Sequence, residues 1–246
     1  MPTTAELVRE QLAAGRVSGV AWPEDAGLPT RWEGVRFEGV DFRRTALADV
    51  QANACTFVGC DFQRADWRDA EFTDCTFYVA ADDLGCDFRY ATLQGGRFTD
   101  CALNMAKFAR AKLYGARFEH CQLQGADFEE ASFSVHPGRN VTLTDGAFEA
   151  CNLAYVSLRK TYLAGLSLRG SRLAHSDLGE ADLSGCDLRE CEMHGVVAIN
   201  TRLVGADLRD AQVAGIDVRR IDLSEARINA WQAPALLETL GIIVED

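Results

Sequence analysis

The sequence predicts an all-β solenoid, a fold in which short repeated units stack along one axis. Between residues 86 and 130 the middle residue of every five is Leu or Phe, from Phe88 to Phe128. A period of five fits neither an α-helix nor a flat β-strand, and a short fixed period is typical of solenoids. All 13 Phe occupy such centres, and all 9 Cys lie two residues before one. Residues two apart in extended backbone point the same way, so both positions should face inward.

The five-residue pattern covers most of the chain. Centres run from Phe37 to Phe77 and, displaced by one residue, from Phe88 through Leu143 and Phe148 to Ile228. The pattern resembles the pentapeptide repeat, and the resemblance covers residues 34–229. That family folds as a right-handed quadrilateral β-helix with four pentapeptides in each turn. The resemblance therefore implies roughly nine coils, stacked at the ordinary strand spacing of about 4.8 Å.

Residues 1–33 do not follow the repeat and are expected to form an N-terminal extension. Thr3 or Thr4 can cap a short helix that runs to about Ala14, with Glu6 near its positive end. Because an uncovered solenoid end invites edge-to-edge pairing, the simplest role of the extension is to cover the first coil. A partner-binding arm is the alternative.

The repeat is interrupted at residues 78–85 and 134–140. The interval from Phe77 to Phe88 is one position longer than two repeats, which breaks the period, and the second segment contains the turn pair of Pro137 and Gly138. Irregular corners without a function are one interpretation, but loops on a rigid scaffold commonly carry binding residues. We therefore expect partner contacts from the following loop residues: Tyr78, Val79, Asp82, Asp83, Leu84, Ser134, Val135, His136, Pro137, Arg139 and Asn140.

Residues 230–246 change character again. Apolar side chains recur at helical spacing and Gly241 is a plausible helix end, so a short C-terminal helix is expected. A helix this apolar must cover the last coil, meet a second copy of the chain, or do both. Two-fold contacts are the commonest oligomer type, so we expect a homodimer. Its interface is predicted to contain the following residues: Trp231, Leu236, Leu237, Leu240, Ile242 and Ile243.

The balance of charge indicates an acidic surface. The chain of 246 residues carries 37 acidic and 25 basic side chains, a net charge of −12. Asp precedes the centre in eleven repeats, at positions 41, 61, 66, 87, 127, 177, 182, 187, 207, 217 and 222. These Asp should point outward in ladders, and an acidic rod repels nucleic acid while attracting basic protein grooves. Arg follows several of them by two residues, as at Arg43 and Arg89, and cancels part of the field. A merely solvated acidic surface is the alternative.

The sequence offers no signature of an enzyme. The four His, at positions 120, 136, 175 and 194, are scattered, and no nucleotide-binding motif is present. The spacing of Cys55 and Cys60, like that of Cys186 and Cys191, does not match usual zinc sites. We therefore expect no catalytic residue, no cofactor and no metal, and nine reduced Cys that serve as small inward residues.

The cellular location can be predicted from the absence of two sequence signals, a membrane-spanning segment and a secretion signal. No apolar run is long enough to cross a membrane. The first residues, MPTTAELVRE, have neither the basic head nor the apolar core of a secretion signal. The sequence therefore predicts a cytoplasmic protein that contacts no membrane.

A closer resemblance is to the Qnr quinolone-resistance proteins, a branch of the pentapeptide repeat family. It spans residues 35–244 and rests on the repeat, the two breaks, the segment GADFEEASF before the second break, and the tail WQAPALLETLGIIV. Qnr proteins are rod-shaped dimers, joined through the C-terminal helix, that bind DNA gyrase and topoisomerase IV and protect them from quinolones. The resemblance implies that this chain does the same as a DNA-like acidic rod with projecting loops. It departs from the family in its N-terminal extension and in a shorter second loop. A scaffolding protein with another partner, such as a secretion or membrane-assembly component, is the alternative.

Overall fold

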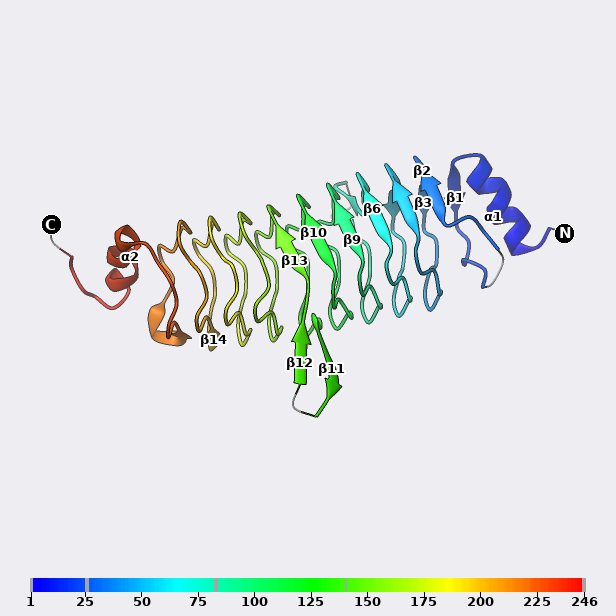
Figure 1. Cartoon of the computed structure of the whole chain (residues 1–246). Coiled ribbons are helices and arrows are strands. Elements are labelled where there is room, and N and C mark those ends of the chain that lie inside the picture. Colours follow the sequence, from blue (N-terminus) through cyan, green and yellow to red (C-terminus); the bar gives the residue numbers. More distant parts are fainter. Residues whose placement is uncertain (1, 25–26, 82–83, 140, 245–246) are drawn as a thin grey trace.

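The computed structural model is a slender, slightly bowed rod with the chain termini at opposite ends (Figure 1). It describes residues 2–24, 27–81, 84–139 and 141–244. The body is a right-handed β-helix, in which backbone N–H groups of one coil donate to carbonyls of the next along the whole rod. This confirms the predicted all-β solenoid. Right-handed winding is the rule for parallel strands joined by crossovers.

Parallel bridges between coils define four sides, which the chain visits in a fixed order. We name the sides by residues bridged in successive coils: first, Thr56 and Thr76; second, Asp41 and Asp61; third, Ala46 and Asp66; fourth, Gln51 and Glu71. Partners are separated by four repeats except where a loop is inserted. On the fourth side the pairing of Glu71 with Arg97 spans the first insertion, and that of Arg117 with Ala147 spans the second. Beyond Ala147 the same side continues through Ser167, Asp187, Asp207 and Arg227, so about ten coils are stacked.

Regular strands are short because each side of a coil holds only a few extended residues. The six-stranded sheet on the fourth side has the order β13–β10–β9–β6–β4–β2, and β1–β3–β5 lie on the first side. The elements of the coils are β1 (Arg16–Ser18), β2 (Arg31–Glu33), β3 (Arg36–Glu38), β4 (Gln51–Asn53), β5 (Thr56–Val58), β6 (Glu71–Thr73), β9 (Arg97–Thr99), β10 (Arg117–Glu119), β13 (Ala147–Glu149), β14 (Thr201–Arg202), the 3-10 turn η1 (Val218–Arg220) and β15 (Ile221–Asp222).

The N-terminal helix α1 (Thr4–Ala13) lies against the first coil (Figure 1). Thr3 caps it reciprocally: the Thr3 hydroxyl accepts from the N–H of Glu6 at 3.2 Å, and the Glu6 carboxylate accepts from the N–H of Thr3 at 2.8 Å. Val8 is fully buried against the core. Stacking begins earlier than the expected residue 34, because β1 pairs in parallel with β3 and Val17 lies opposite Phe37. The extension therefore supplies both a helix and the first coil.

The core is a set of aromatic and aliphatic columns along the rod axis. Every Phe is at most 1% exposed and every Cys at most 2%, which confirms the predicted inward positions. Equivalent rings in neighbouring coils stack face to face, as Phe57 on Phe77 at 4.6 Å and Phe88 on Phe108 at 4.8 Å between centroids. Such ring pairs contribute about 0.5–1.5 kcal/mol each beyond the burial of their area.

Several small polar side chains inside the coils donate to the backbone of the preceding coil, whereas the buried Ser176 hydroxyl has no hydrogen-bond partner among the described residues. The Cys121 thiol donates to the carbonyl of Phe98 at 3.2 Å, the Ser171 hydroxyl to Phe148 at 3.0 Å, and the Thr201 hydroxyl to Leu178 at 2.7 Å. Cys, Ser and Thr can therefore replace Ala where this bond forms without leaving a buried donor unpaired.

Candidate partner-binding surface

The first loop is a minimal hairpin at the junction of the first and second sides. Strand β7 (Tyr78–Val79) pairs antiparallel with β8 (Leu84–Gly85), with Val79 opposite Leu84. Tyr78 and Val79 are half-buried, whereas Leu84 is exposed. The predicted contact residues Asp82 and Asp83 lie outside the described residues.

The second loop is longer than predicted and projects from the rod (Figure 1). Strand β11 (Ser134–Gly138) pairs antiparallel with β12 (Val141–Thr144), and Val135 lies opposite Leu143. Leu143, predicted as an inward repeat centre, is 46% exposed, so that prediction is wrong. Side chains alternate along a strand, which places Val141 on the same face as Leu143 and Val135. Val141 is 45% exposed, so the hairpin presents an apolar face to solvent.

The remaining residues predicted as partner contacts in the second loop differ in their exposure to solvent. Ser134 and Val135 at the base of the hairpin are half-buried. His136, Pro137 and Arg139 towards its tip are exposed and available to a partner. Asn140 lies outside the described residues.

The two loops leave the rod at opposite corners. The first follows Thr76 on the first side and precedes Asp87 on the second. The second follows Ser132 on the third side and precedes Ala147 on the fourth. In a four-sided cross-section these two corners are diagonal to each other. The insertions are two coils apart, which is about 10 Å along the axis at the usual strand spacing.

Each loop rejoins the coil at a glycine that has no space for a side chain. A Cβ on Gly85 would lie 2.4 Å from the carbonyl carbon of Met105. Gly146 has a φ of +145°, and its Cβ would lie 2.9 Å from the carbonyl oxygen of Ala116. Before Gly146, the Asp145 carboxylate accepts from Arg117 at 3.1 Å. These contacts fix the base of both loops, so a rigid frame holds them.

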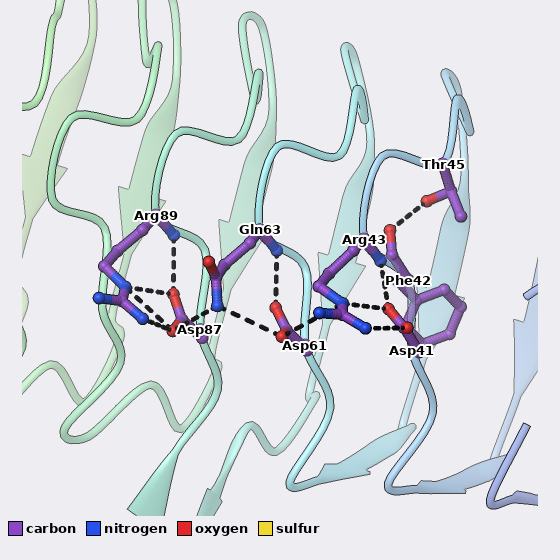
Figure 2. A network of polar contacts seen from close by, with 8 residues as sticks. All are labelled: Asp41, Phe42, Arg43, Thr45, Asp61, Gln63, Asp87 and Arg89. Atoms are coloured by element: carbon purple, nitrogen blue, oxygen red, sulfur yellow. Dashed lines mark hydrogen bonds and ion pairs between the residues drawn. The ribbon is translucent and has the colours of Figure 1, made fainter. Parts of the chain in front are cut away.

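The Asp residues before the centres form polar ladders with their neighbours. On the second side, Asp41 accepts from both the backbone N–H and the guanidinium Nε of Arg43 at 2.9 Å (Figure 2). Gln63 links two coils, because its amide donates to Asp61 at 3.3 Å and to Asp87 at 3.1 Å (Figure 2). The Asp side chains therefore pin the backbone of their own corner and join coils laterally.

Arg partners neutralise a large part of these ladders. The Arg43 guanidinium holds the pKa of Asp41 below its ordinary value, and the Arg209 guanidinium lowers the pKa of Asp207 to about 2. The same two-residue pairing is formed by the following Arg: Arg43, Arg68, Arg89, Arg189, Arg209 and Arg219. The field of the acidic ladders is accordingly weaker than their sequence count suggests.

Carboxylates without a cationic partner gather around the fourth side in the N-terminal half of the rod. Asp49 and Asp69 occupy the corner before this side, and Asp74 and Asp100 the corner after it. Within the described residues, none of the four has Lys or Arg within 4.0 Å; Asp100 has only His120, at 3.7 Å. All four adopt positive φ, which Asp tolerates better than most residues. This is the surface on which a basic partner would find uncompensated charge.

The C-terminal segment covers the last coil and leaves apolar side chains in solvent. It consists of the 3-10 turn η2 (Ala230–Gln232) and the short helix α2 (Ala233–Glu238), which lies at the end of the rod (Figure 1). Leu236 packs against the core, and Leu237 is half-buried. Trp231 is 62% and Ile243 85% exposed. Leu240 and Ile242 are exposed as well.

Gln232 anchors this segment, and sequence reasoning missed it. The side chain is fully buried, and its amide donates to the carbonyls of Leu208 at 2.8 Å and Ala211 at 2.7 Å. Its carbonyl accepts from the N–H of Asn229 at 2.7 Å. A single polar residue in an otherwise apolar segment was the available signal, because such a residue must find buried partners.

The thiols and imidazoles show no assembled reactive centre. Burial raises the pKa of Cys60, Cys186 and Cys191 to about 12, so these thiols are poor nucleophiles. His175, expected to be isolated, stacks on Tyr155 at 5.1 Å and contacts His194 at 5.3 Å between ring centroids. Among the described residues, no three His, Cys, Asp or Glu side chains converge as a metal site, and no helix could span a membrane.

Comparison with known proteins agrees with this architecture. A family model for pentapeptide repeats matches residues 111–134, 151–189, 167–203 and 186–225. A trypsin-treated form of QnrB1, a plasmid-mediated fluoroquinolone resistance protein, superposes with a TM-score of 0.78 at 30% identity, covering 86% of this chain and 99% of that one. Full-length QnrB1 gives a TM-score of 0.73 at 28% identity over 92% and 100% of the two chains.

A more distant relative shares the fold alone. HetL, a pentapeptide repeat protein of heterocyst differentiation regulation from the cyanobacterium Nostoc sp. strain PCC 7120, has a TM-score of 0.51 at 20% identity, over 92% of this chain and 95% of its own. A sequence comparison with curated proteins gives no significant match. The match to QnrB1 covers nearly all of that protein at 30% identity, whereas the match to HetL shows the repeat fold alone. The chain is therefore a Qnr-like member of the pentapeptide repeat family.

Proposed function

We propose that this protein binds a type II topoisomerase, DNA gyrase or topoisomerase IV, and protects it from quinolones by contact rather than by catalysis. The observation that carries the proposal is the similarity to QnrB1, a fluoroquinolone resistance protein, over 99% of that chain. The proposal places the protein in the cytoplasm, where its partner works on DNA.

Two surfaces support this function. The unpaired carboxylates at Asp49, Asp69, Asp74 and Asp100 would attract a basic groove that otherwise holds DNA. The second-loop hairpin would add short-range contacts through the exposed Val141 and its neighbours. Charge steers the encounter and is screened beyond about 8 Å at physiological salt, so added salt should slow association more than it speeds dissociation.

The dimer forms part of the same proposal. Trp231, Ile243 and their apolar neighbours lie exposed at one end of the rod, and a second copy meeting them about a two-fold axis would cover them. Two rods joined tail to tail would then present both loops twice.

The test is rescue of gyrase supercoiling in the presence of ciprofloxacin, together with direct binding to purified gyrase. Val141→Ser combined with Leu143→Ser removes the apolar face of the hairpin but keeps both strands, and should reduce rescue strongly. Val197→Ser is the matched control, because Val197 is equally exposed at 45% and lies on the second side, away from the hairpin. A wild-type protein that neither binds gyrase nor restores supercoiling would contradict the proposal and favour the scaffolding alternative.

A further inference from the structure

A file of cations runs along the corner between the second and third sides in the N-terminal half of the rod. We call it the cationic corner and define it as Arg44, Arg64, Tyr90 and Arg110, which occupy equivalent positive-φ positions in four successive coils. At about 4.8 Å per coil the file is about 14 Å long. Arg44, Arg64 and Arg110 are exposed, and the Tyr90 ring is 41% exposed between them.

Within the described part of the chain, neither Arg44 nor Arg64 has a carboxylate oxygen within 4.0 Å, although Arg43 next to Arg44 is held by Asp41 at 2.6 Å. Lys107 and Lys112 flank the corner and likewise form no ion pair with a described residue. On a protein with a net charge of −12, this is a concentration of uncompensated positive charge.

Tyr90 organises the middle of the file. The guanidinium carbon of Arg64 lies 5.1 Å from the Tyr90 ring centroid and that of Arg110 lies 5.9 Å from it. Arg110 also donates to the Tyr90 hydroxyl at 2.9 Å. The cation–π contact holds the Arg64 guanidinium in place while leaving its N–H donors available to an anion, whereas Arg110 is already engaged by Tyr90 and Glu130. The file ends where Glu130 accepts from Arg110 at 2.7 Å.

Two shallow clefts give the corner a shape. One, of about 360 Å³, is lined by Arg43, Arg44, Gln63 and Arg64 and by Asp41, whose carboxylate is already paired with Arg43. The other, of about 260 Å³, is lined by Arg89, Tyr90, Ala109 and Arg110 but also by three carboxylates, Asp127, Glu129 and Glu130, so it does not favour an anion. An anionic ligand that fills the first cleft and runs along this edge of the rod towards Tyr90 must be narrow and elongated.

We propose that the cationic corner binds an extended acidic segment of another protein, with carboxylates seated on Arg44 and Arg64, the two guanidinium groups without an ion pair to a described residue. An extended chain advances about 3.4 Å per residue, so about five residues cover the file and present alternate side chains to one side. Guanidinium groups pair with carboxylates through two parallel hydrogen bonds. A nucleic acid is disfavoured, because its many phosphates would reach the ladder carboxylates Asp41, Asp61 and Asp87 beside the corner.

This surface is independent of the proposed topoisomerase contact. The cationic corner is diagonal to the corner that carries Asp74 and Asp100. A basic groove docked on the acidic corners would leave it open to a second, acidic partner. The inference can therefore be tested with no topoisomerase present.

The experiment measures fluorescence anisotropy of a labelled peptide of alternating Glu and Gly on the full-length protein at low salt. Arg44→Gln combined with Arg64→Gln should weaken binding at least tenfold, and added salt should weaken binding to the wild type. Arg64→Lys keeps the charge but loses the planar stack on Tyr90. Its affinity for the peptide should lie between that of the wild type and that of the double variant. Circular dichroism and thermal melting confirm that each variant retains its coils.

Arg31→Gln is the matched control, since Arg31 is an exposed cation without an ion pair to a described residue, on the fourth side. It should bind the peptide as the wild type does. An equal loss of peptide affinity in Arg31→Gln and in the double variant would show a general charge effect and overturn the proposal. Absence of peptide binding at millimolar protein would overturn it too. So would preferential binding of a single-stranded oligonucleotide that depends on Arg44 and Arg64.

Discussion

At the scale of the residue, backbone space decides where the coil can open. Most corners accept a side chain at positive φ, as Arg44 and Tyr90 show, because the side chain points into solvent. Gly85 and Gly146 differ, since their missing Cβ atoms would collide with the backbone of the adjacent coil. These two positions are where the inserted hairpins must return to the stack.

Gly85→Ala should therefore destabilise the protein by about 1–3 kcal/mol, the usual cost of forcing extra volume into a packed site. Urea unfolding followed by circular dichroism measures the free energy of unfolding. Gly138→Ala is the control, because among the described residues other than its chain neighbours no heavy atom lies within 4 Å of the position of its Cβ. Equal stability of Gly85→Ala and the wild type would show that the loop base adjusts at no cost.

Acid should remove the stabilisation that the Asp207–Arg209 pair provides. The folded pKa of Asp207 is about 2, below the ordinary value of about 3.9 for an unfolded chain, so the pair stabilises the fold above about pH 4. That contribution is lost as pH falls through the folded pKa. Arg209→Gln should lower the melting temperature at neutral pH and should match the wild type near pH 2. The pair is partly exposed, so the effect should stay below about 1 kcal/mol. A pH-independent difference would contradict this assignment, and Arg31→Gln provides the control.

At the scale of the element, the repeat pattern predicted the coils and the inward Phe and Cys, and the capping signal of Thr3 or Thr4 with Glu6 predicted the N-terminal helix, because each rests on local spacing. It located the first loop because the interval from Phe77 to Phe88 is not a multiple of five. The length of the second insertion could not be predicted, because the interval from Phe133 to Phe148 is a multiple of five and preserves the phase of the repeat. Leu143 therefore falls on a centre position although it lies in the hairpin.

The first coil was missed for a different reason. Val17, Trp22 and Trp32 keep the phase of Phe37, but Gly27 stands at the centre between the two Trp and interrupts the apolar series. Whether an apolar residue faces inward depends on hydrogen bonding to the next coil, which spacing alone does not reveal. The cationic corner was equally invisible, because its members are distant in sequence and only the winding brings them into one file.

Gln232→Ala should loosen the C-terminal cap. The change removes the donor of the Ala211 carbonyl and one of the two donors of the Leu208 carbonyl, which keeps the N–H of Ala211, at a cost of about 1–3 kcal/mol. Hydrogen exchange should rise in the last coil and in α2, with a lower melting temperature. Gln212→Ala, at an exposed Gln, should change neither measurement. Unchanged exchange in Gln232→Ala would mean that apolar packing alone holds the cap.

At the scale of the whole molecule, the rod has one closed end and one apolar end. Helix α1 covers the first coil, whereas the end beyond α2 exposes Trp231 and Ile243. We expect two copies to pair at this apolar end, because the sides of the coils themselves are charged and already hydrogen-bonded between coils.

Leu237→Asp should convert the proposed dimer to a monomer. The substitution would bury an unpaired carboxylate in the apolar contact, at a cost on the order of several kcal/mol. Multi-angle light scattering gives the mass, and circular dichroism should show that the coils persist. Leu84→Asp, the same change at an exposed Leu of the first loop, should remain dimeric. A Leu237→Asp protein that stays dimeric would place the interface elsewhere.

The diagonal placement of the two loops restricts the geometry of any partner that uses both. A flat surface laid against the rod can reach one of the two corners, but the rod itself then shields the other. A partner that contacts both loops must enclose the rod in a cleft at least as wide as one coil. Such a partner must open this cleft before the rod can enter and close it afterwards. The association rate would then be limited by the rate at which the partner opens.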